Sequence, residues 1–337
     1  MISVFQMKML HLMTLVVRLF FLFLFFSCSS HKKSSSLEKK VFNIVGYTQG
    51  TTYNIKYFFN NEKIKKNEID SLLDIIDYSM SSYIDSSNIS QINNNSTNKL
   101  DTLLKKVLER SIIICENTDG SFDVTIAPVV NSFGFGAQKK LQTIEGDPSL
   151  LVGCDKFKIN DNLILKENNV KIDVNGIAQG FSVDFISSYF NSKGIFNYMI
   201  EIGGEVYCSG EKNNKNWTLG VSDPLGSPND YIYKVPLKNK ALATSGSTRK
   251  LSLDSNYTHI ISPSNYFPIQ NNLLSVSVLA NNCMDADAYA TAFMEMGIKR
   301  SMEFLEKNTY NLEVMFVYLD SLSGNMLDLR TDGFIVK

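Results

Sequence analysis

The sequence predicts an α+β fold in which helices pack on a mainly antiparallel sheet. Segments rich in β-branched and aromatic residues recur along the chain, and amphipathic segments with helical spacing lie between them. The two kinds of segment do not alternate strictly, as they would in a doubly wound parallel sheet. With 337 residues and a hydrophobic content of 44%, the chain is long enough to bury a large core.

The N-terminal part of the folded body predicts strands followed by helices. The stretch "VFNIVGYTQGTTYNIKYFF" (residues 41–59) predicts one or two strands, with breaks at Gly46 and Gly50. Apolar residues recur at helical spacing over residues 67–83 and again over residues 101–120. Between these two helices, the Asn- and Ser-rich "SNISQINNNSTN" predicts a surface loop.

The remainder of the chain predicts further strands and two more helices. A Gly-punctuated turn leads into a helix over residues 180–194, and an Ala-rich segment predicts a helix from residue 283. Strands are expected in the segments 155–160, 163–174, 197–210, 217–223, 231–246, 273–283 and 313–320. We expect those from residue 197 to residue 246 to be successive strands of one antiparallel sheet.

The first 27 residues have the form of a signal peptide. Lys8 and Arg18 precede an apolar run, "LFFLFLFFSC", and the chain becomes polar immediately after it. Ser27 before Cys28, with Leu24 upstream, resembles a bacterial lipobox, although Phe25 and Phe26 make the match imperfect. We therefore expect a signal peptide (1–27), a lipidated Cys28 with a polar tether (28–40) and one folded domain (41–337). The alternatives are an uncleaved anchor and an unmodified Cys28.

Charge and cysteine content exclude two classes of function. The formal net charge is -1 and no basic stripe is visible, so nucleic-acid binding is not expected. Apart from Cys28, the cysteines are scattered without a C-x-x-C pair, so no zinc site is expected. Because they lie in apolar contexts, we expect buried free thiols; disulfides outside the cytoplasm are the alternative. These cysteines are Cys115, Cys154, Cys208 and Cys283.

The stretch "CMDADAYATAF" (residues 283–293) carries two carboxylates in a segment patterned for burial. If it is helical, Asp287 and Thr291 are four residues apart and share a face, whereas Asp285 points elsewhere. A carboxylate and a hydroxyl on one face are oxygen ligands of the kind that Mg²⁺ takes. The alternative is structural: Asp285 caps the helix, Asp287 favours its positive end and Thr291 packs in the core.

A second group of residues lies in "KIDVNGIAQGFSVD". Asp173 is expected to end an apolar strand, and Gly176 and Gly180 bracket a tight turn into a helix. Backbone N–H groups at such a helix start can bind a phosphate. The glycine spacing differs from G-x-G-x-x-G, so no Rossmann fingerprint is present.

A third group combines "TSGSTRK" with "THIISP". It brings Ser245, Thr248, Arg249 and His259 into one region. The other two histidines lie in the leader and tether, so His259 is the one histidine available for acid–base chemistry in the folded body. Its position before two isoleucines also fits a structural strand residue. No Ser/His/Asp arrangement can be built from this set.

Together these motifs resemble the ApbE family of bacterial flavin transferases, which are often lipoproteins. The resemblance follows the order of the motifs through nearly the whole mature chain. They are "GYTQGTTYNIKY", "MSSY", "TDGSFDVTIAPVVNSFGFG", "IDVNGIAQGFSVD", "EIGGEVYCSG", "ALATSGSTRK", "HIISPSNYFPI" and "MDADAYATAFMEMG". Departures are Gln49 in place of the usual methionine, Gln179 in place of the usual lysine or glutamate, and the absence of Asp-Pro-x-Thr-Gly after His259.

The resemblance implies an α+β fold related to the T-fold, a bound FAD and Mg²⁺ on its diphosphate. It implies metal ligation by Asp287, Thr291 and the backbone carbonyl of Gly176, with catalytic roles for Asp287 and for His259, which would assist proton transfer. Loss of charge at position 179 would alter how FAD is held. Flavin contacts are implied for Gln49, Ser81, Ser121, Phe122, Asp123, Asp173, Gln179 and Ile260.

The activity implied is that of an FAD:protein FMN transferase, which moves FMN from FAD to a threonine hydroxyl of an acceptor protein and releases AMP. The implied acceptors are flavin-carrying subunits of membrane redox complexes. The implied location is the periplasmic side of the bacterial cell membrane, where lipid on Cys28 would anchor the protein. Two alternatives remain: an FAD pyrophosphatase giving FMN and AMP, and a lipid-anchored flavin-binding protein without catalysis.

Overall fold

The structure is a computed structural model that describes residues 40–60, 63–137, 144, 146–227, 230–247, 258–307 and 310–337, together with Val4, Met7 and Met9. The chain divides into two compact units, Met1–Lys39 and Lys40–Lys337. Cys28, the tether up to Lys39 and nearly all of the predicted signal peptide lie outside the described residues, so these predictions stay predictions. In the part that the structure describes, no helix is long and apolar enough to cross a membrane.

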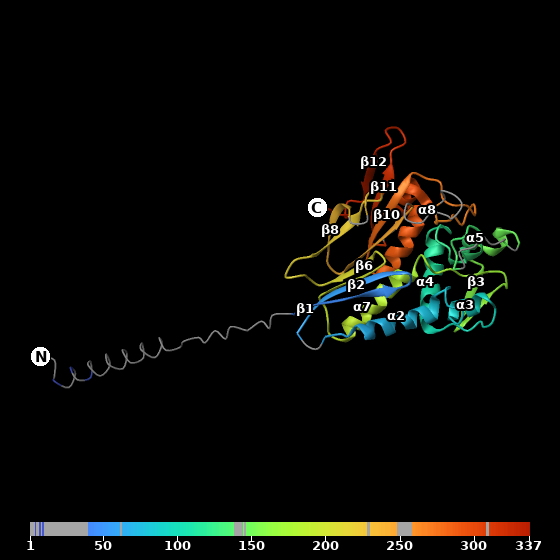
Figure 1. Cartoon of the computed structure of the whole chain (residues 1–337). Helices are drawn as coiled ribbons and strands as arrows, with labels where there is room; N and C mark the ends of the chain where they lie inside the picture. The colour runs from blue at the N-terminus through green and yellow to red at the C-terminus, as the bar shows by residue number, and fades with distance from the viewer. Residues whose placement is uncertain are drawn as a thin grey trace. The chain divides into compact units, whose positions relative to one another are not determined.

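An eight-stranded sheet forms the centre of the domain (Figure 1). Its order is β1-β2-β5-β6-β9-β10-β11-β12, and every neighbouring pair is antiparallel. The predicted α+β class with an antiparallel sheet is therefore confirmed. The strands are β1 (Lys40–Thr48), β2 (Thr51–Phe59), β5 (Tyr198–Ile202), β6 (Glu205–Ser209), β9 (Lys240–Gly246), β10 (Leu273–Ala280), β11 (Glu313–Leu319) and β12 (Met326–Arg330).

Helices cover one face of this sheet. Their apolar sides and the inward residues of the strands form one large core that includes Tyr57, Ile76, Phe190 and Phe293. Helices α7 and α8 pack against each other and against neighbouring strands, which places the start of each helix beside the other. The helices are α2 (Lys66–Met80), α3 (Asn88–Asn93), α4 (Thr102–Asn117), η1 (Val124–Ile126), α5 (Ala127–Ser132), α6 (Pro148–Leu151), α7 (Ala178–Ser192) and α8 (Cys283–Lys307).

A separate hairpin covers the opposite face. Strands β7 (Trp217–Ser222) and β8 (Tyr231–Leu237) pair only with each other among the described strands, so the prediction that they continue the main sheet was wrong. Trp217 and Val235 of this hairpin pack in a second core with Cys208 and Met315 of the main sheet. Burial of this apolar row against the outer face explains the separate layer.

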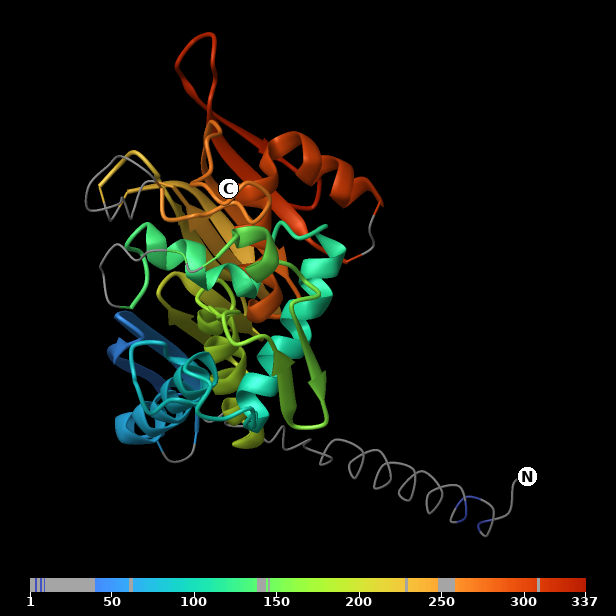
Figure 2. The ribbon, with the colours of Figure 1, turned by 90° about the vertical axis from the view of Figure 1, so that its right-hand side faces the viewer.

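The third sheet is the β3–β4 hairpin, Phe157–Asn160 paired with Leu163–Lys166. It runs beside α4, as Figure 2 shows, and Lys105 of α4 donates to the side-chain oxygen of Asn162 in its turn. The predicted strand over 163–174 ends at Lys166 in the structure. Asp173 therefore follows an irregular segment and does not end a strand. The segment is fixed by the Asn93 amide, which bonds both backbone groups of Ile172.

Several local predictions need correction. Gly46 lies inside β1 and does not break it; it pairs with Tyr53, and a Cβ there would meet the Tyr53 ring at 2.5 Å, so glycine leaves room for that ring. Residues Asn88–Asn93 form α3, not a loop, because Ser87 caps the helix and Ile89 and Ile92 are buried. The Gly50 break is confirmed, since Gly50 occupies the turn between β1 and β2 with φ of 72°.

The cysteines also differ from the expectation of free thiols. Cys115 of α4 and Cys154, which follows α6, form a disulfide across 39 residues of sequence. Cys208 and Cys283 are buried free thiols, as expected. The widely spaced positions of Cys115 and Cys154 gave no sign of this pair, because only the folding of α4 against the loop after α6 brings them together.

Candidate functional site

The site is built where α7 and α8 begin. Gly180 permits the close approach, because a Cβ at this position would lie 2.3 Å from the carbonyl oxygen of Cys283 and 2.8 Å from Cβ of Asp287. Asp184, one turn further along α7, accepts hydrogen bonds from the backbone N–H groups of Cys283 and Met284 at 2.8 and 2.9 Å. Asp184 thus satisfies free N–H groups at the start of α8 from a neighbouring helix.

Asp287 is a buried carboxylate within this junction. Its side chain is 6% exposed, and Oδ2 accepts the backbone N–H of Gly180 at 3.0 Å. Burial raises the pKa of Asp287 to about 7; the Gly180 hydrogen bond opposes this rise, and the negative charge of Asp184 adds to it. A buried carboxylate of this kind is stabilised in its charged form by a cation.

Two further residues of the predicted metal set, Thr291 and Gly176, lie beside one another. Thr291, one turn after Asp287 in α8 and half-buried, has its hydroxyl 3.3 Å from that of Ser245 on β9. A Cβ at Gly176 would lie 3.2 Å from the Thr291 hydroxyl, which places the Gly176 backbone against it. Carboxylate, hydroxyl and backbone carbonyl are all hard oxygen donors, so this set fits Mg²⁺. The assignment itself stays a prediction.

Asp285 has a different role from Asp287, as the helical spacing predicted. Its carboxylate forms a two-pronged ion pair with Arg110 of α4, at 2.6 Å to Nε and 2.8 Å to Nη2. The cap of α8 is Asn282, whose side-chain oxygen accepts the backbone N–H of Asp285 at 2.8 Å. The alternative in which Asp285 caps the helix was therefore wrong, because Asp285 lies inside the first turn and pairs with another helix.

The predicted flavin residues of the central segments lie next to this junction. Asp123 is 6% exposed; its Oδ1 accepts from the backbone and hydroxyl of Thr125, while Oδ2 has no partner among the described residues. Burial raises the pKa of Asp123 above its usual range. The backbone N–H of Asp173 donates to the carbonyl of Val124 at 2.7 Å, and Phe122 lies 3.3 Å from the Cβ position of Gly176.

Other predicted flavin residues border α7. Gln49, in the β1–β2 turn with φ of 51°, donates from Nε2 to the Ser182 hydroxyl of α7 at 2.7 Å. Gln179 lies in the first turn of α7, with its side-chain amide 3.1 Å from the Cβ position of Gly203. Ser81 caps the C-terminus of α2. Gln49 thus contacts the helix that carries Gln179.

The third group of the sequence analysis has fewer contacts with the α7–α8 junction. His259 is half-buried and its ring meets Phe135 edge-on, with ring centroids 6.3 Å apart. Ile260 is buried, and its carbonyl accepts the N–H of Ile269. Thr248 and Arg249 lie outside the described residues. The third group nevertheless contributes Ser245, whose hydroxyl lies beside that of the predicted metal ligand Thr291.

The sequence reasoning missed three residues that support the site. Asp184 and Arg110 hold the start of α8, and Arg300, beyond a break in α8 at Gly297, donates to the Ser121 hydroxyl at 2.9 Å. Asp184 ends the quoted motif "GFSVD", so its position after a glycine-rich helix start was an available signal. The partners of Arg110 and Arg300 are 175 and 179 residues away in sequence, and no local pattern indicates them.

Comparisons with known proteins show which family and which proteins this chain is similar to. The ApbE family model matches residues 49–316. An FAD:protein FMN transferase of Vibrio cholerae is 33% identical over 79% of this chain and 84% of its own, and one of Haemophilus influenzae is 32% identical over 89% and 90%. A solved structure, flavin transferase ApbE from Vibrio cholerae, superposes with a TM-score of 0.77 at 30% identity, covering 88% of this chain and 98% of that one.

Proposed function

This chain belongs to the ApbE family, and we propose that it acts as an FAD:protein FMN transferase. The observation that carries the proposal is the α7–α8 junction, where Asp287 accepts from Gly180 and where Thr291 and Phe122 both lie against Gly176. Two relatives named for this activity match over 84% and 90% of their own length.

Asp287, Thr291 and the carbonyl of Gly176 would hold Mg²⁺. Once bound, the ion supplies positive charge that offsets the negative charge of the FAD diphosphate and of the departing AMP. The protein's part is to keep the three oxygens rigid, through the Gly180 and Ser245 contacts. A bound cation would hold Asp287, the one carboxylate of this set, in its charged form.

The residues around α7 would position FAD. Asp123, with one buried oxygen that no described residue satisfies, and Asp173 offer acceptors for hydrogen-bond donors of the flavin or of the ribose. Gln49, Ser81, Ser121, Phe122, Gln179 and Ile260 complete the predicted flavin contacts. Gln179 carries no charge, so its contribution to FAD binding is a hydrogen bond and not an ion pair.

The reaction exchanges the phosphoanhydride bond of FAD for a phosphoester bond to the acceptor. The threonine oxygen of the acceptor bonds to the FMN-side phosphorus, the bond from that phosphorus to the bridging oxygen breaks, and AMP leaves with that oxygen. His259 would accept the threonine proton, because a neutral hydroxyl is a poor nucleophile without a base. If water takes the place of threonine, the products are free FMN and AMP.

The acceptors we propose are flavin-carrying subunits of membrane redox complexes. A signal peptide and lipid on Cys28 would place the enzyme at the periplasmic surface of the bacterial membrane. The polar tether from residue 28 to residue 40 would let the domain reach them. Mass spectrometry of the mature N-terminus tests the anchor: a diacylglyceryl-modified Cys28 supports it, and an unmodified or uncleaved N-terminus contradicts it.

The activity is tested by incubating the mature protein with FAD, Mg²⁺ and a candidate acceptor that has an exposed threonine motif. Flavin fluorescence that stays with the acceptor after denaturing electrophoresis is the expected result. An acceptor in which that threonine is replaced by valine is the matched control and should remain dark. Fluorescence found only as free FMN would support the pyrophosphatase, and no turnover with FAD bound would support a non-catalytic flavoprotein.

A further inference from the structure

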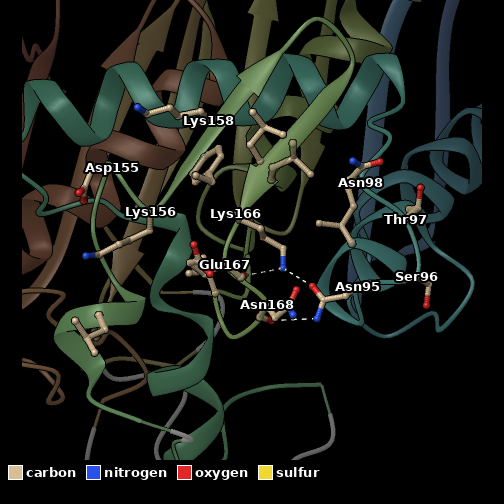
Figure 3. A pocket seen from close by; sticks show the side chains of 16 residues that line it. Asn95, Ser96, Thr97, Asn98, Asp155, Lys156, Lys158, Lys166, Glu167 and Asn168 are labelled. Carbon is tan, nitrogen blue, oxygen red and sulfur yellow. Dashed lines mark hydrogen bonds between the residues drawn. The ribbon is translucent and has the colours of Figure 1, made fainter.

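Four polar side chains form a continuous hydrogen-bond network that ends on a predicted flavin contact. The hydroxyl of Ser262 donates to Oε1 of Glu295 at 2.7 Å. Oε2 of that carboxylate accepts from Nη1 of Arg300 at 3.3 Å, and Nη2 of Arg300 donates to the hydroxyl of Ser121 at 2.9 Å. None of the four residues lines the cavity of about 860 Å³ beside the β3–β4 hairpin that Figure 3 shows, so the network is a separate feature.

Most of this network is buried. The side chain of Glu295 is only 6% exposed, and both serines are buried, whereas Arg300 is half-exposed. A carboxylate withdrawn from water to this extent depends on its hydrogen-bond and ionic partners. Glu295 has such a partner on each oxygen, Ser262 on one and Arg300 on the other. The buried carboxylate therefore restricts where the guanidinium of Arg300 can lie.

A break in α8 allows Arg300 to reach Glu295. Side chains three or four positions apart on a helix are neighbours, whereas these two residues are five apart. Gly297, between them, has φ of 70° and ψ of 173°, a backbone conformation that is essentially restricted to glycine. Before the break, the carbonyl of Met294 accepts the side-chain amide of Asn271 at 2.8 Å, which satisfies this backbone group. The break is thus built into the sequence.

Ser262, at the other end of the network, is fixed by its own backbone. Its N–H donates to the carbonyl of Phe267 at 2.8 Å, and its carbonyl accepts the N–H of Tyr266 at 2.9 Å. The turn that these bonds close follows directly after His259 and Ile260 in the sequence. The network therefore connects Ser121 with the segment that carries two other predicted site residues.

Arg300 determines the direction of hydrogen bonding at Ser121. A guanidinium can only donate, so the serine oxygen accepts from Arg300 and the serine proton is left for another acceptor. None of the described residues accepts that proton. We propose that Arg300 is a positioning residue, which directs the hydroxyl of Ser121 as a donor toward an acceptor atom of FAD. The identity of this ligand rests on the proposed function.

The test measures FAD binding by quenching of flavin fluorescence, without an acceptor and with EDTA present, so that no FAD is consumed. Ser121→Ala and Arg300→Met should each weaken binding about fivefold, the effect of one hydrogen bond. The double variant should bind within twofold of the weaker single variant, because both changes remove the same contact. Arg300→Lys keeps a group that only donates and should bind FAD more tightly than Arg300→Met.

Lys299→Met is the matched control, because it removes a cation from the neighbouring exposed position of α8 and should change FAD affinity less than twofold. In the transfer assay, Arg300→Met should raise KM for FAD and change kcat less than twofold, since the contact with FAD exists before the reaction.

The inference is overturned if Ser121→Ala binds FAD as tightly as the wild type, or if the effects of Ser121→Ala and Arg300→Met are additive. It is also overturned if Lys299→Met matches Arg300→Met, or if Arg300→Lys binds no better than Arg300→Met. A wild type that binds FAD but transfers no FMN would contradict the proposed function alone, because the binding comparison needs no turnover.

Discussion

The backbone N–H of Gly180 donates to Oδ2 of Asp287 over 3.0 Å, and this bond joins the first turn of α7 to the first turns of α8. The contact exists because position 180 has no side chain. We expect Gly180→Ala to force the helices apart, since its methyl carbon would lie 2.3 Å from the Cys283 carbonyl oxygen. Overpacking of this kind costs about 1–3 kcal/mol. Urea unfolding should show the loss, and Mg²⁺-dependent activity should fall with it.

Gly220→Ala is a suitable control for that variant. Position 220 lies in β7, and the atoms nearest to the added methyl group would be those of the exposed Tyr231 side chain, at 3.1 Å compared with 2.3 Å at position 180. Equal loss of stability and activity in the two variants would contradict a special role for the α7–α8 contact.

Thr291 should contribute to the site through its hydroxyl and not through its shape. Thr291→Val keeps the volume but removes the oxygen, whereas Thr291→Ser keeps the oxygen. We expect Thr291→Val to raise the Mg²⁺ concentration for half-maximal activity by about 10–100-fold and Thr291→Ser to stay near the wild type. Activity measured across a Mg²⁺ titration distinguishes them, and identical titrations for both variants would remove Thr291 from the ligand set.

Asp184 should make stability depend on pH. Burial raises the pKa of Asp184 to about 6, although the N–H groups of Cys283 and Met284 oppose this rise. The folded state therefore holds a proton that the unfolded state has lost, between the usual aspartate pKa and about 6. The contribution of Asp184 to the free energy of unfolding is therefore full at low pH and is lost as the pH rises through about 6. The slope is at most about 1.4 kcal/mol per pH unit.

Measuring the unfolding of Asp184→Asn as a function of pH checks the direction of this pH dependence. The amide does not titrate, so the variant should be less stable overall because it loses an acceptor, yet its stability should change less steeply between pH 4 and 6. A slope equal to that of the wild type would show that Asp184 titrates normally.

The Arg110–Asp285 pair should stabilise the start of α8. Both side chains are mostly buried, 27% and 15% exposed, and their paired geometry is specific to a guanidinium. Removal of one partner from a buried pair costs about 3–5 kcal/mol, and less is expected here because water reaches part of the pair. In a double-mutant cycle, Arg110→Met and Asp285→Asn should be less than additive. Strict additivity would show that the pair is not coupled.

The Cys115–Cys154 disulfide should stabilise the domain. Closing a loop across 39 residues of sequence contributes about 2–4 kcal/mol. The double variant Cys115→Ser, Cys154→Ser should lose this amount, and reductant should destabilise the wild type but not the variant. Cys208→Ala serves as a control for a buried free thiol. A wild type whose stability is indifferent to reductant would contradict the disulfide.

Local sequence patterns predicted the features that depend only on residues close together in the chain. The i, i+4 relation of Asp287 and Thr291 follows from helical geometry alone, and the glycine turn before α7 was visible as a break in the pattern. The ion pair of Asp285 with Arg110 was not predictable, because it depends on how α4 packs on α8. Likewise, β7 reads as a strand from its residues, but only burial of Trp217 against Cys208 and its neighbours decides which layer it joins.

The most direct test of the proposed transferase compares AMP released with FMN attached to the acceptor, by chromatography and intact-protein mass spectrometry, in the wild type and in Asp287→Asn. The account predicts one AMP for each acceptor molecule that gains an FMN mass on its threonine, and at least a hundredfold slower release of AMP in Asp287→Asn. Release of AMP without any mass gain on the acceptor, or full activity of Asp287→Asn, would contradict it.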